Sequence, residues 1–194
     1  MTSRLLLGAS ILCLSLGPST MTVRGQATGA SATGNLLQLM RGVFFPTSNM
    51  IFNVQSNDPN DKEKKKAERK PGSGADAFDW NQWGGSLYSG WEDVEYAAVV
   101  LAEVTPTLLT PGRLCQNGKP VPVERADWIS YTNALVRAAR KSYEAARKRD
   151  QMAVADSTDE LSQACQNCHA VYRRGAPGAD PGSPSALAQR CSAP

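Results

Sequence analysis

Histidine is almost absent from this 194-residue sequence, in which His169 is the only one. A lone histidine cannot supply two imidazole ligands to one metal ion, and it leaves no second imidazole for acid–base chemistry. The sequence also places no paired carboxylates on a shared helix face. We therefore expect a protein that is not an enzyme.

Strong charge of one sign is also missing. The formal net charge is +3 at pH 7, from 21 Lys and Arg against 18 Asp and Glu. Arg4 and Arg24 belong to the first 27 residues, and removing these two from the 21 leaves 19 basic against 18 acidic residues. A balance this close to neutral excludes the basic surface that nucleic-acid binding requires.

Long apolar runs are absent after the first residues of the chain. Arg4 precedes an apolar run at 5–16, and the following polar stretch ends in Gly25, Gln26 and Ala27. This layout predicts a secretory signal peptide at 1–27, cleaved after Ala27. The apolar run has about 12 residues, whereas crossing a bilayer takes roughly 20. We therefore expect a soluble protein exported to the periplasm, with 28–194 as a single domain.

Cysteine is scarce, since Cys13 lies in the predicted signal and four others follow it: Cys115, Cys165, Cys168 and Cys191. An oxidising compartment keeps cysteines paired or otherwise occupied. If a motif uses Cys165 and Cys168, the economical proposal is a disulfide between Cys115 and Cys191. The alternative is that these two are unrelated thiols.

No segment shows the alternation typical of strands, and apolar spacing instead predicts four helices. The predicted helices cover about 33–45, 83–103, 124–149 and 157–174. Pro46 is expected to end the first helix, and Ser157, with Glu160 three residues later, to cap the last. The predicted fold is all-α, an antiparallel four-helix bundle.

Three segments between or after these helices are predicted to lack regular structure. They are an inserted charged loop at 56–79, a proline-rich connector at 104–123 and an irregular C-terminal tail at 175–194. The loop offers no apolar residue larger than alanine before Phe78, so it has little to bury. A disulfide from Cys115 in the connector to Cys191 would tie the connector to the tail.

The motif that carries chemistry is CQNCH, from Cys165 to His169 on the last predicted helix. Cys-x-x-Cys-His is the attachment signature of c-type haem. Two thiols three positions apart on one helical turn can both form thioethers with the haem vinyl groups, and the adjacent imidazole can then bind the iron. The motif predicts one covalent haem c, held by Cys165 and Cys168 with His169 as a ligand.

Other interpretations of the motif explain less of the sequence. A thioredoxin-like redox pair expects a strand before the motif and a cysteine at the start of a helix. A structural zinc site needs a fourth ligand, for which only Cys115 and Cys191 are available. A disulfide between Cys165 and Cys168 would leave His169 unexplained.

With one histidine, the sixth iron position falls to methionine, lysine or another weak ligand, or it stays open. After the predicted signal the methionines are Met40, Met50 and Met152. In a helix Met152 would lie roughly 25 Å from His169, which is too far for a shared iron. Met40, on the apolar face of the first helix, is the first choice and Met50 the second. Methionine on such a face also serves commonly as core filler.

These features resemble the class II c-type cytochromes, that is, the cytochrome c-prime family and its low-spin, methionine-ligated relatives. The matching segments are CQNCHAVYRRG in the last helix, LLQLMRGVFF in the first, and the alanine-rich third helix after Trp128. The resemblance covers about 33–174. It implies that Cys165 and Cys168 hold the haem and that His169 and Met40 are the iron ligands.

The resemblance also implies that Arg173 or Arg41 contacts a haem propionate. The loop, connector and tail are longer than a minimal member needs, and they put the usual antiparallel homodimer in doubt. The expected function is a periplasmic monohaem c-type cytochrome that passes one electron between redox partner proteins. The alternative is a five-coordinate protein of the c-prime kind that binds or senses nitric oxide or carbon monoxide.

Overall fold

The computed structural model describes residues 32–61, 90–173, 180 and 182–192. Within these ranges the regular structure is helical, and an isolated bridge between Leu114 and Pro120 is the one β-type pairing. The all-α prediction is therefore confirmed. The predicted signal at 1–27 and residues 62–79 of the charged loop lie outside the described residues. Among the described helices, none combines the length and hydropathy that crossing a membrane requires.

The first helical segment consists of four elements in direct succession. They are α1 (Leu36–Leu39), the π-helix η1 (Met40–Phe44), α2 (Phe45–Phe52) and the 3₁₀-helix η2 (Asn53–Gln55). The segment begins with a reciprocal cap, in which the side chain of Asn35 accepts from the Gln38 N–H and the side chain of Gln38 accepts from the Asn35 N–H. This cap satisfies two backbone donors that the first turn leaves without helical partners.

The prediction that Pro46 ends this helix is wrong. Proline lacks an N–H, and in a regular α-helix its ring collides with the carbonyl four residues earlier, here that of Gly42. In η1 the Phe45 N–H instead donates to the Met40 carbonyl, five residues earlier. The wider turn accommodates the ring, so Pro46 occupies the first turn of α2, where a missing N–H is tolerated.

The remaining elements are α5 (Trp91–Val104), the 3₁₀-helix η3 (Thr105–Leu109), α6 (Ala126–Arg147), α7 (Gln151–Tyr172) and α8 (Pro184–Gln189). The predicted start of the second helix, at 83–89, lies outside the described residues. The last long helix begins earlier than predicted, because Asp150 caps it by accepting from the Ala153 N–H at 3.0 Å. Ser157 is not a cap. It is fully buried, and its hydroxyl lies 2.8 Å from that of Ser142.

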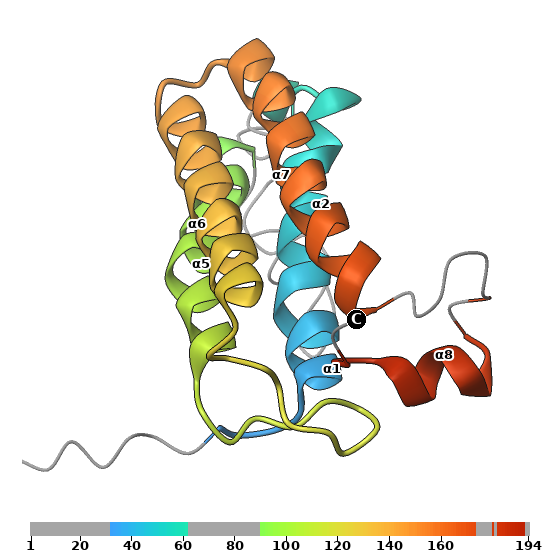
Figure 1. Cartoon of the computed structure of the whole chain (residues 1–194). Helices are drawn as coiled ribbons and strands as arrows, with labels where there is room; N and C mark the ends of the chain where they lie inside the picture. Colours follow the sequence, from blue (N-terminus) through green and yellow to red (C-terminus); the bar gives the residue numbers. More distant parts are fainter. Residues whose placement is uncertain (1–31, 62–89, 174–179, 181, 193–194) are drawn as a thin grey trace, which may run out of the picture.

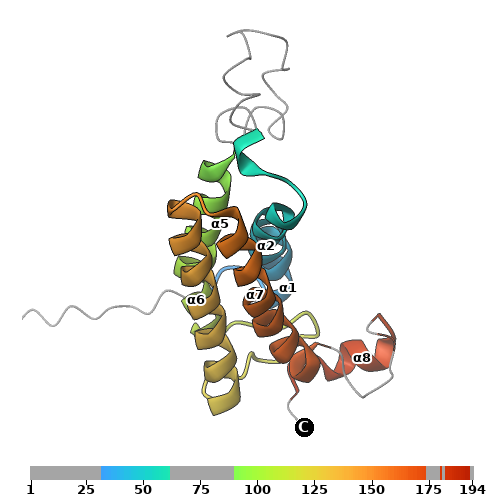
Figure 2. The same cartoon turned by 90° about the horizontal axis from the view of Figure 1, so that it is seen from above.

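In the part of the chain that the structure describes, the first helical segment, α5, α6 and α7 lie side by side (Figure 1). The helix α6 packs against α5 on one side and α7 on the other, and α2 packs against both α5 and α7. Only residues 148–150 separate α6 from α7, so these two helices run in opposite directions. The end of α7 and the start of the first segment lie at the same end of the molecule (Figures 1 and 2).

Large side chains fill one part of the core and small side chains fill another. Trp91, Trp128, Ile51 and Leu101 are fully or almost fully buried. The predicted apolar stripe of the third helix is buried along α6, except that Tyr131 is only partly covered. Most of this stripe is alanine or serine, which lets α6 and α7 approach closely.

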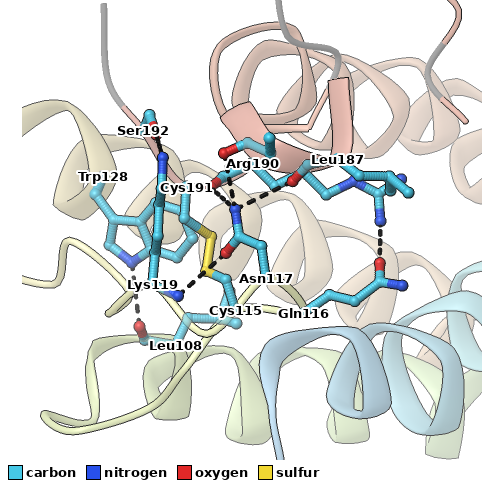
Figure 3. Close-up of a disulfide and its surroundings, with 11 residues drawn as sticks. Leu108, Cys115, Gln116, Asn117, Lys119, Trp128, Leu187, Arg190, Cys191 and Ser192 are labelled. Atoms are coloured by element: carbon cyan, nitrogen blue, oxygen red, sulfur yellow. Dashed lines mark hydrogen bonds between the residues drawn. A yellow bond between two sulfur atoms is a disulfide. The ribbon is translucent and has the colours of Figure 1, made fainter. Parts of the chain in front are cut away.

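The predicted pairing of Cys115 with Cys191 is confirmed, with the two Cα atoms 6.4 Å apart. The amide of Asn117 donates to three carbonyls of the tail, at 2.9 to 3.1 Å (Figure 3); they belong to Leu187, Ala188 and Arg190. The Cys191 N–H donates to the Tyr172 carbonyl at 3.0 Å. The tail is therefore not irregular throughout, because it contains α8 and is fastened to the connector and to the end of α7.

Removing this disulfide should destabilise the protein. The bridge joins residues separated by 76 positions, so it restricts the unfolded chain over a long loop. We expect the double variant Cys115→Ser/Cys191→Ser to lose about 2–4 kcal/mol of unfolding free energy in urea titrations. Reducing the wild-type protein should produce the same loss, and reduction should not change the variant further. Equal stability of oxidised and reduced wild-type protein would contradict the expectation.

Candidate functional site

The CQNCH motif occupies the last two turns of α7. Cys165 and Cys168 are three residues apart and therefore lie on one face of the helix. Both thiols are reduced, and both residues are partly buried, as is His169. The fold thus presents two unoxidised sulfur atoms and an adjacent imidazole at one end of the molecule.

The electrostatic environment keeps these thiols protonated. Burial raises the pKa of Cys165, and it raises the pKa of Cys168 to about 12 with smaller contributions from the charges of Cys165 and Asp127. Their position near the C-terminus of α7 also disfavours negative charge, because the helix dipole is negative there. Redox-active cysteines need a lowered pKa, so this pair is not built as a thioredoxin-like centre.

The described residues also do not form a zinc site around the motif. The two cysteines that the sequence offered as further ligands, Cys115 and Cys191, are bonded to each other. Across the part of the chain that the structure describes, no three His, Cys, Asp or Glu side chains gather closely enough to hold a metal ion. Among the described residues, the thiols of Cys165 and Cys168 thus do not form part of a ligand set for a tetrahedral zinc ion.

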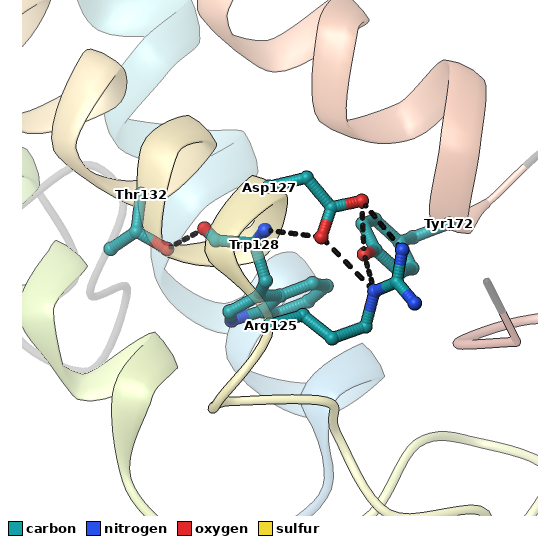
Figure 4. A network of polar contacts seen from close by, with 5 residues as sticks. All are labelled: Arg125, Asp127, Trp128, Thr132 and Tyr172. Carbon is teal, nitrogen blue, oxygen red and sulfur yellow. Dashed lines mark hydrogen bonds and ion pairs between the residues drawn. The ribbon is translucent and has the colours of Figure 1, made fainter.

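A polar network next to the motif fixes the last turn of α7 to the first turn of α6 (Figure 4). The Tyr172 hydroxyl donates to Asp127 Oδ2 at 2.8 Å, and Arg125 Nε donates to Asp127 Oδ1 and to the Tyr172 oxygen at 3.0 Å each. The Trp128 N–H donates to Asp127 Oδ1 at 3.0 Å. Asp127 therefore accepts from two side chains and from the backbone of α6.

The aromatic rings reinforce this attachment. The rings of Trp128 and Tyr172 meet edge to face, with centroids 4.8 Å apart. The indole N–H of Trp128 donates to the Leu108 carbonyl at 3.1 Å, which ties the same ring to η3. Tyr172 is three residues after His169, so its anchoring also limits the movement of the motif.

The charges in the network shift the pKa values of its members. Hydrogen bonds from Arg125 and then Tyr172 lower the pKa of Asp127 from 3.8 to about 2. Burial first, and the hydrogen bond to Asp127 second, raise the pKa of Tyr172. The network is therefore set up with a carboxylate, a guanidinium and a neutral phenol over the ordinary pH range.

The first helical segment and α7 are closely packed at the end where α7 begins. The Gln55 amide donates to the Thr158 hydroxyl, and the Gln151 amide donates to the Val54 carbonyl at 3.2 Å. Nearby, apolar side chains from both helices are almost entirely buried; they are Ile51, Val54, Val154 and Leu161. The core is complete at this level of the molecule.

The core is less complete at the end that carries the motif. Some apolar residues there, such as Trp128 and Tyr172, are buried. Others are only partly buried, although they pack against the core; they are Leu36, Leu39 and Met40 from the first segment and Cys165, Cys168 and Val171 from α7. Backbone contact between the first segment and α7 runs through α2 and η2 and is at most slight at α1 and η1. Apolar surface on both helices is therefore incompletely covered beside the thiols.

The three methionines occupy different places. Met40 belongs to this partly covered apolar surface. Met50 lines a shallow hollow with Asn53, Gly90 and other residues near the start of α5. Met152 is 76% exposed in the first turn of α7, almost the full helix away from His169. Of these methionines, only Met40 lies at the end of the molecule that holds the motif.

Arg41 and Arg173, predicted to bind a propionate, are both exposed and lie near a third arginine. Burial lowers the pKa of the Arg190 guanidinium, and the positive charges of Arg173 and Arg41 lower it further. Arg190 also donates to the side chain of Gln116. The structure thus brings together the two predicted arginines and adds one from the tail.

Sequence reasoning missed Arg190 and the partners of Tyr172. Arg190 lies in a segment that was predicted to be irregular, and only its neighbour Cys191 hinted that the segment returns to the fold. Asp127 lies 45 positions before Tyr172, and no local spacing connects the two.

Comparison with known proteins supplies no family. No family model, no curated protein and no solved structure matches this chain. An assignment of function therefore has to rest on the residues and their arrangement.

The shift at Asp127 predicts how stability depends on pH. Because folding lowers this pKa from 3.8 to about 2, the carboxylate stabilises the fold fully above pH 4, and the contribution is lost as pH falls toward 2. The urea midpoint of the wild type should exceed that of Asp127→Asn at pH 7, and the two should converge near pH 2. Asp159→Asn, at an exposed position of α7, is the control and should track the wild type. A gap between wild type and Asp127→Asn that persists at pH 2 would argue against the mechanism.

Proposed function

We propose that the protein is a periplasmic monohaem c-type cytochrome of the class II kind, a four-helix bundle that transfers one electron between redox partner proteins. One observation carries the proposal. Two reduced, partly buried cysteines and an adjacent histidine share the last turns of α7, beside apolar surface that the fold leaves incompletely covered.

The residues at this end fit a haem group. Cys165 and Cys168 have the spacing for two thioethers on one helical turn. Leu36, Leu39 and Val171 offer apolar side chains that a flat, apolar macrocycle would cover. Completing the core in this way would remove apolar surface from water, worth about 25 cal/mol per Å². The spacing of the two cysteines and the apolar side chains around them thus both support a haem at this end.

When bound, haem supplies a one-electron iron couple, and a methionine–histidine ligand pair raises its reduction potential relative to two histidines. His169 would be one iron ligand in this proposal, and the contacts of Tyr172 would hold the end of α7 that carries it. Met40, on the first helical segment, would be the other. A ligand at each iron position would exclude small molecules such as carbon monoxide.

Arg41 and Arg173 would bind a propionate carboxylate of the haem. Guanidinium groups form charge-assisted hydrogen bonds with carboxylates. The two arginines act electrostatically on Arg190, so an anion among them would relieve repulsion between like charges. Redox partners would then approach the edge of the haem at this end of the bundle.

Covalent attachment is the first test of this function. We expect the protein, expressed with a c-type haem-attachment system, to gain the mass of one haem and to begin at residue 28. The variant Cys165→Ala/Cys168→Ala should lack this added mass. The matched variant Cys115→Ala/Cys191→Ala should keep it, because the second pair forms the disulfide. Wild-type protein that carries no haem under these conditions would refute the proposal.

The distal ligand is tested by the visible spectrum. We expect a low-spin ferric spectrum with a weak, long-wavelength sulfur-to-iron band in the wild type. Met40→Ala should abolish that band and produce a high-spin spectrum, whereas Met50→Ala should preserve it. The reverse pattern would assign the ligand to Met50. A high-spin wild type whose reduced form binds carbon monoxide would instead support the five-coordinate, gas-binding alternative.

A further inference from the structure

The inward-facing residues of the first helical segment have an unusual spacing. Phe44, Ser48 and Ile51 are buried, and Leu36 and Met40 pack against the same core. From Leu36 to Ser48 these positions are four residues apart three times in succession. In a regular α-helix, each such step turns about 40° beyond a full circle, so three steps would rotate the line by about 120°. A regular helix would spread them over about a third of its circumference, with Leu36 and Met40 toward one edge of the buried face.

The π-helix η1 compensates for this rotation of the inward-facing positions. A π turn contains more residues than an α turn, so each residue advances by a smaller angle. Because η1 covers Met40–Phe44, it lies within the run of four-residue steps. The wider turn brings Met40 and Leu36 back toward the direction of Phe44. The direction in which the Met40 side chain leaves the helix therefore depends on η1.

Pro46 accounts for η1. Its missing N–H and its ring oppose the regular hydrogen bond to the Gly42 carbonyl. Side chains that follow Pro46 add hydrogen bonds to backbone carbonyls of this region. Thr47 Oγ1 donates to the Val43 carbonyl at 2.6 Å, and Asn49 Nδ2 donates to the Phe45 carbonyl at 2.6 Å. Ser48 Oγ also donates to the Phe45 carbonyl, at 3.1 Å. Both the proline and the polar residues after it favour the wide turn.

We propose that Pro46 is a positioning residue for Met40: by imposing the wide turn of η1, it keeps the methionine side chain on the core-facing side of the first helical segment. The inference rests on the proposed function, since it concerns the proposed distal ligand. Pro46 itself is exposed and would touch neither the haem nor the iron. It acts only through the rotation of the helix that precedes it.

The variant Pro46→Ala tests this role in the haem-loaded protein. Alanine restores the N–H that can bond to the Gly42 carbonyl, so η1 should become regular α-helix and rotate Met40 away from the core-facing side of the segment. We expect the sulfur-to-iron band to disappear and the high-spin fraction to rise. Haem attachment and far-ultraviolet circular dichroism should be unchanged. The control is Gly42→Ala, where an added Cβ meets no atom within 4 Å and Pro46 is retained, and the band should persist.

A rescue experiment distinguishes an effect on the direction of the methionine side chain from an effect on the stability of the fold. In a regular helix, position 41 lies nearer to the direction that Met40 has in η1. The variant Pro46→Ala/Met40→Leu/Arg41→Met should therefore recover the sulfur-to-iron band. The variant Met40→Leu/Arg41→Met, with Pro46 retained, should lack it. A purely stabilising role for Pro46 would not be corrected by moving the methionine one position.

The outcomes distinguish this inference from the function on which it rests. If wild-type protein shows the band and Pro46→Ala retains it at full intensity, the positioning role is wrong and the function stands. If Pro46→Ala loses the band but the triple variant does not restore it, the positioning role is also wrong. If the wild type has haem but no band, Met40 ligation itself fails, and the inference fails with it.

Discussion

Tyr172 is the residue on which the arrangement of the motif-bearing end depends. Its ring packs against Trp128, its hydroxyl donates to Asp127, and its carbonyl accepts from the Cys191 N–H. Three parts of the chain, namely α6, α7 and the tail, thus meet at one side chain and its backbone. Because Cys168 and His169 lie within about one turn of this point, these contacts also hold the motif in place.

The tail is held beside Tyr172 and the connector by several contacts of its own. The backbone bond from Cys191 positions the tail beside Tyr172, and the disulfide and the amide of Asn117 hold the tail to the connector. Together they carry Arg190 toward Arg41 and Arg173 against electrostatic repulsion. A loose tail would move Arg190 into solvent, since like charges separate unless other contacts hold them together.

Local signals in the sequence predicted much of the fold, and long-range contacts account for what was missed. Apolar spacing located the helices, and cysteine counting, on the expectation of an oxidising compartment, paired Cys115 with Cys191. Pro46 was misread because proline ends most helices, whereas here a π turn and three polar side chains accommodate it. Ser157 resembled a cap, but its hydroxyl bonds to Ser142 across a helix interface that the sequence does not reveal.

The same distinction applies to the candidate site. The Cys-x-x-Cys-His spacing is local and could be recognised directly, and the helical face of Met40 followed from periodicity. The direction of Met40 is proposed to depend on η1, and the end of α7 near His169 is held by Arg125, Asp127 and Trp128, which lie 41 to 44 positions earlier in the chain. These are properties of packing, so no window of sequence around the motif contains them.

The burial of apolar side chains differs along the bundle. Ile51 and Val154 are fully buried, whereas Cys168 is only partly buried. A haem attached at the motif, as proposed, would cover apolar surface at that end. A group that binds only the folded state stabilises it, and covalent attachment would make that stabilisation permanent. Filling the site with larger side chains would give a more stable chain without a cofactor, at the loss of the surface on which the cofactor would pack.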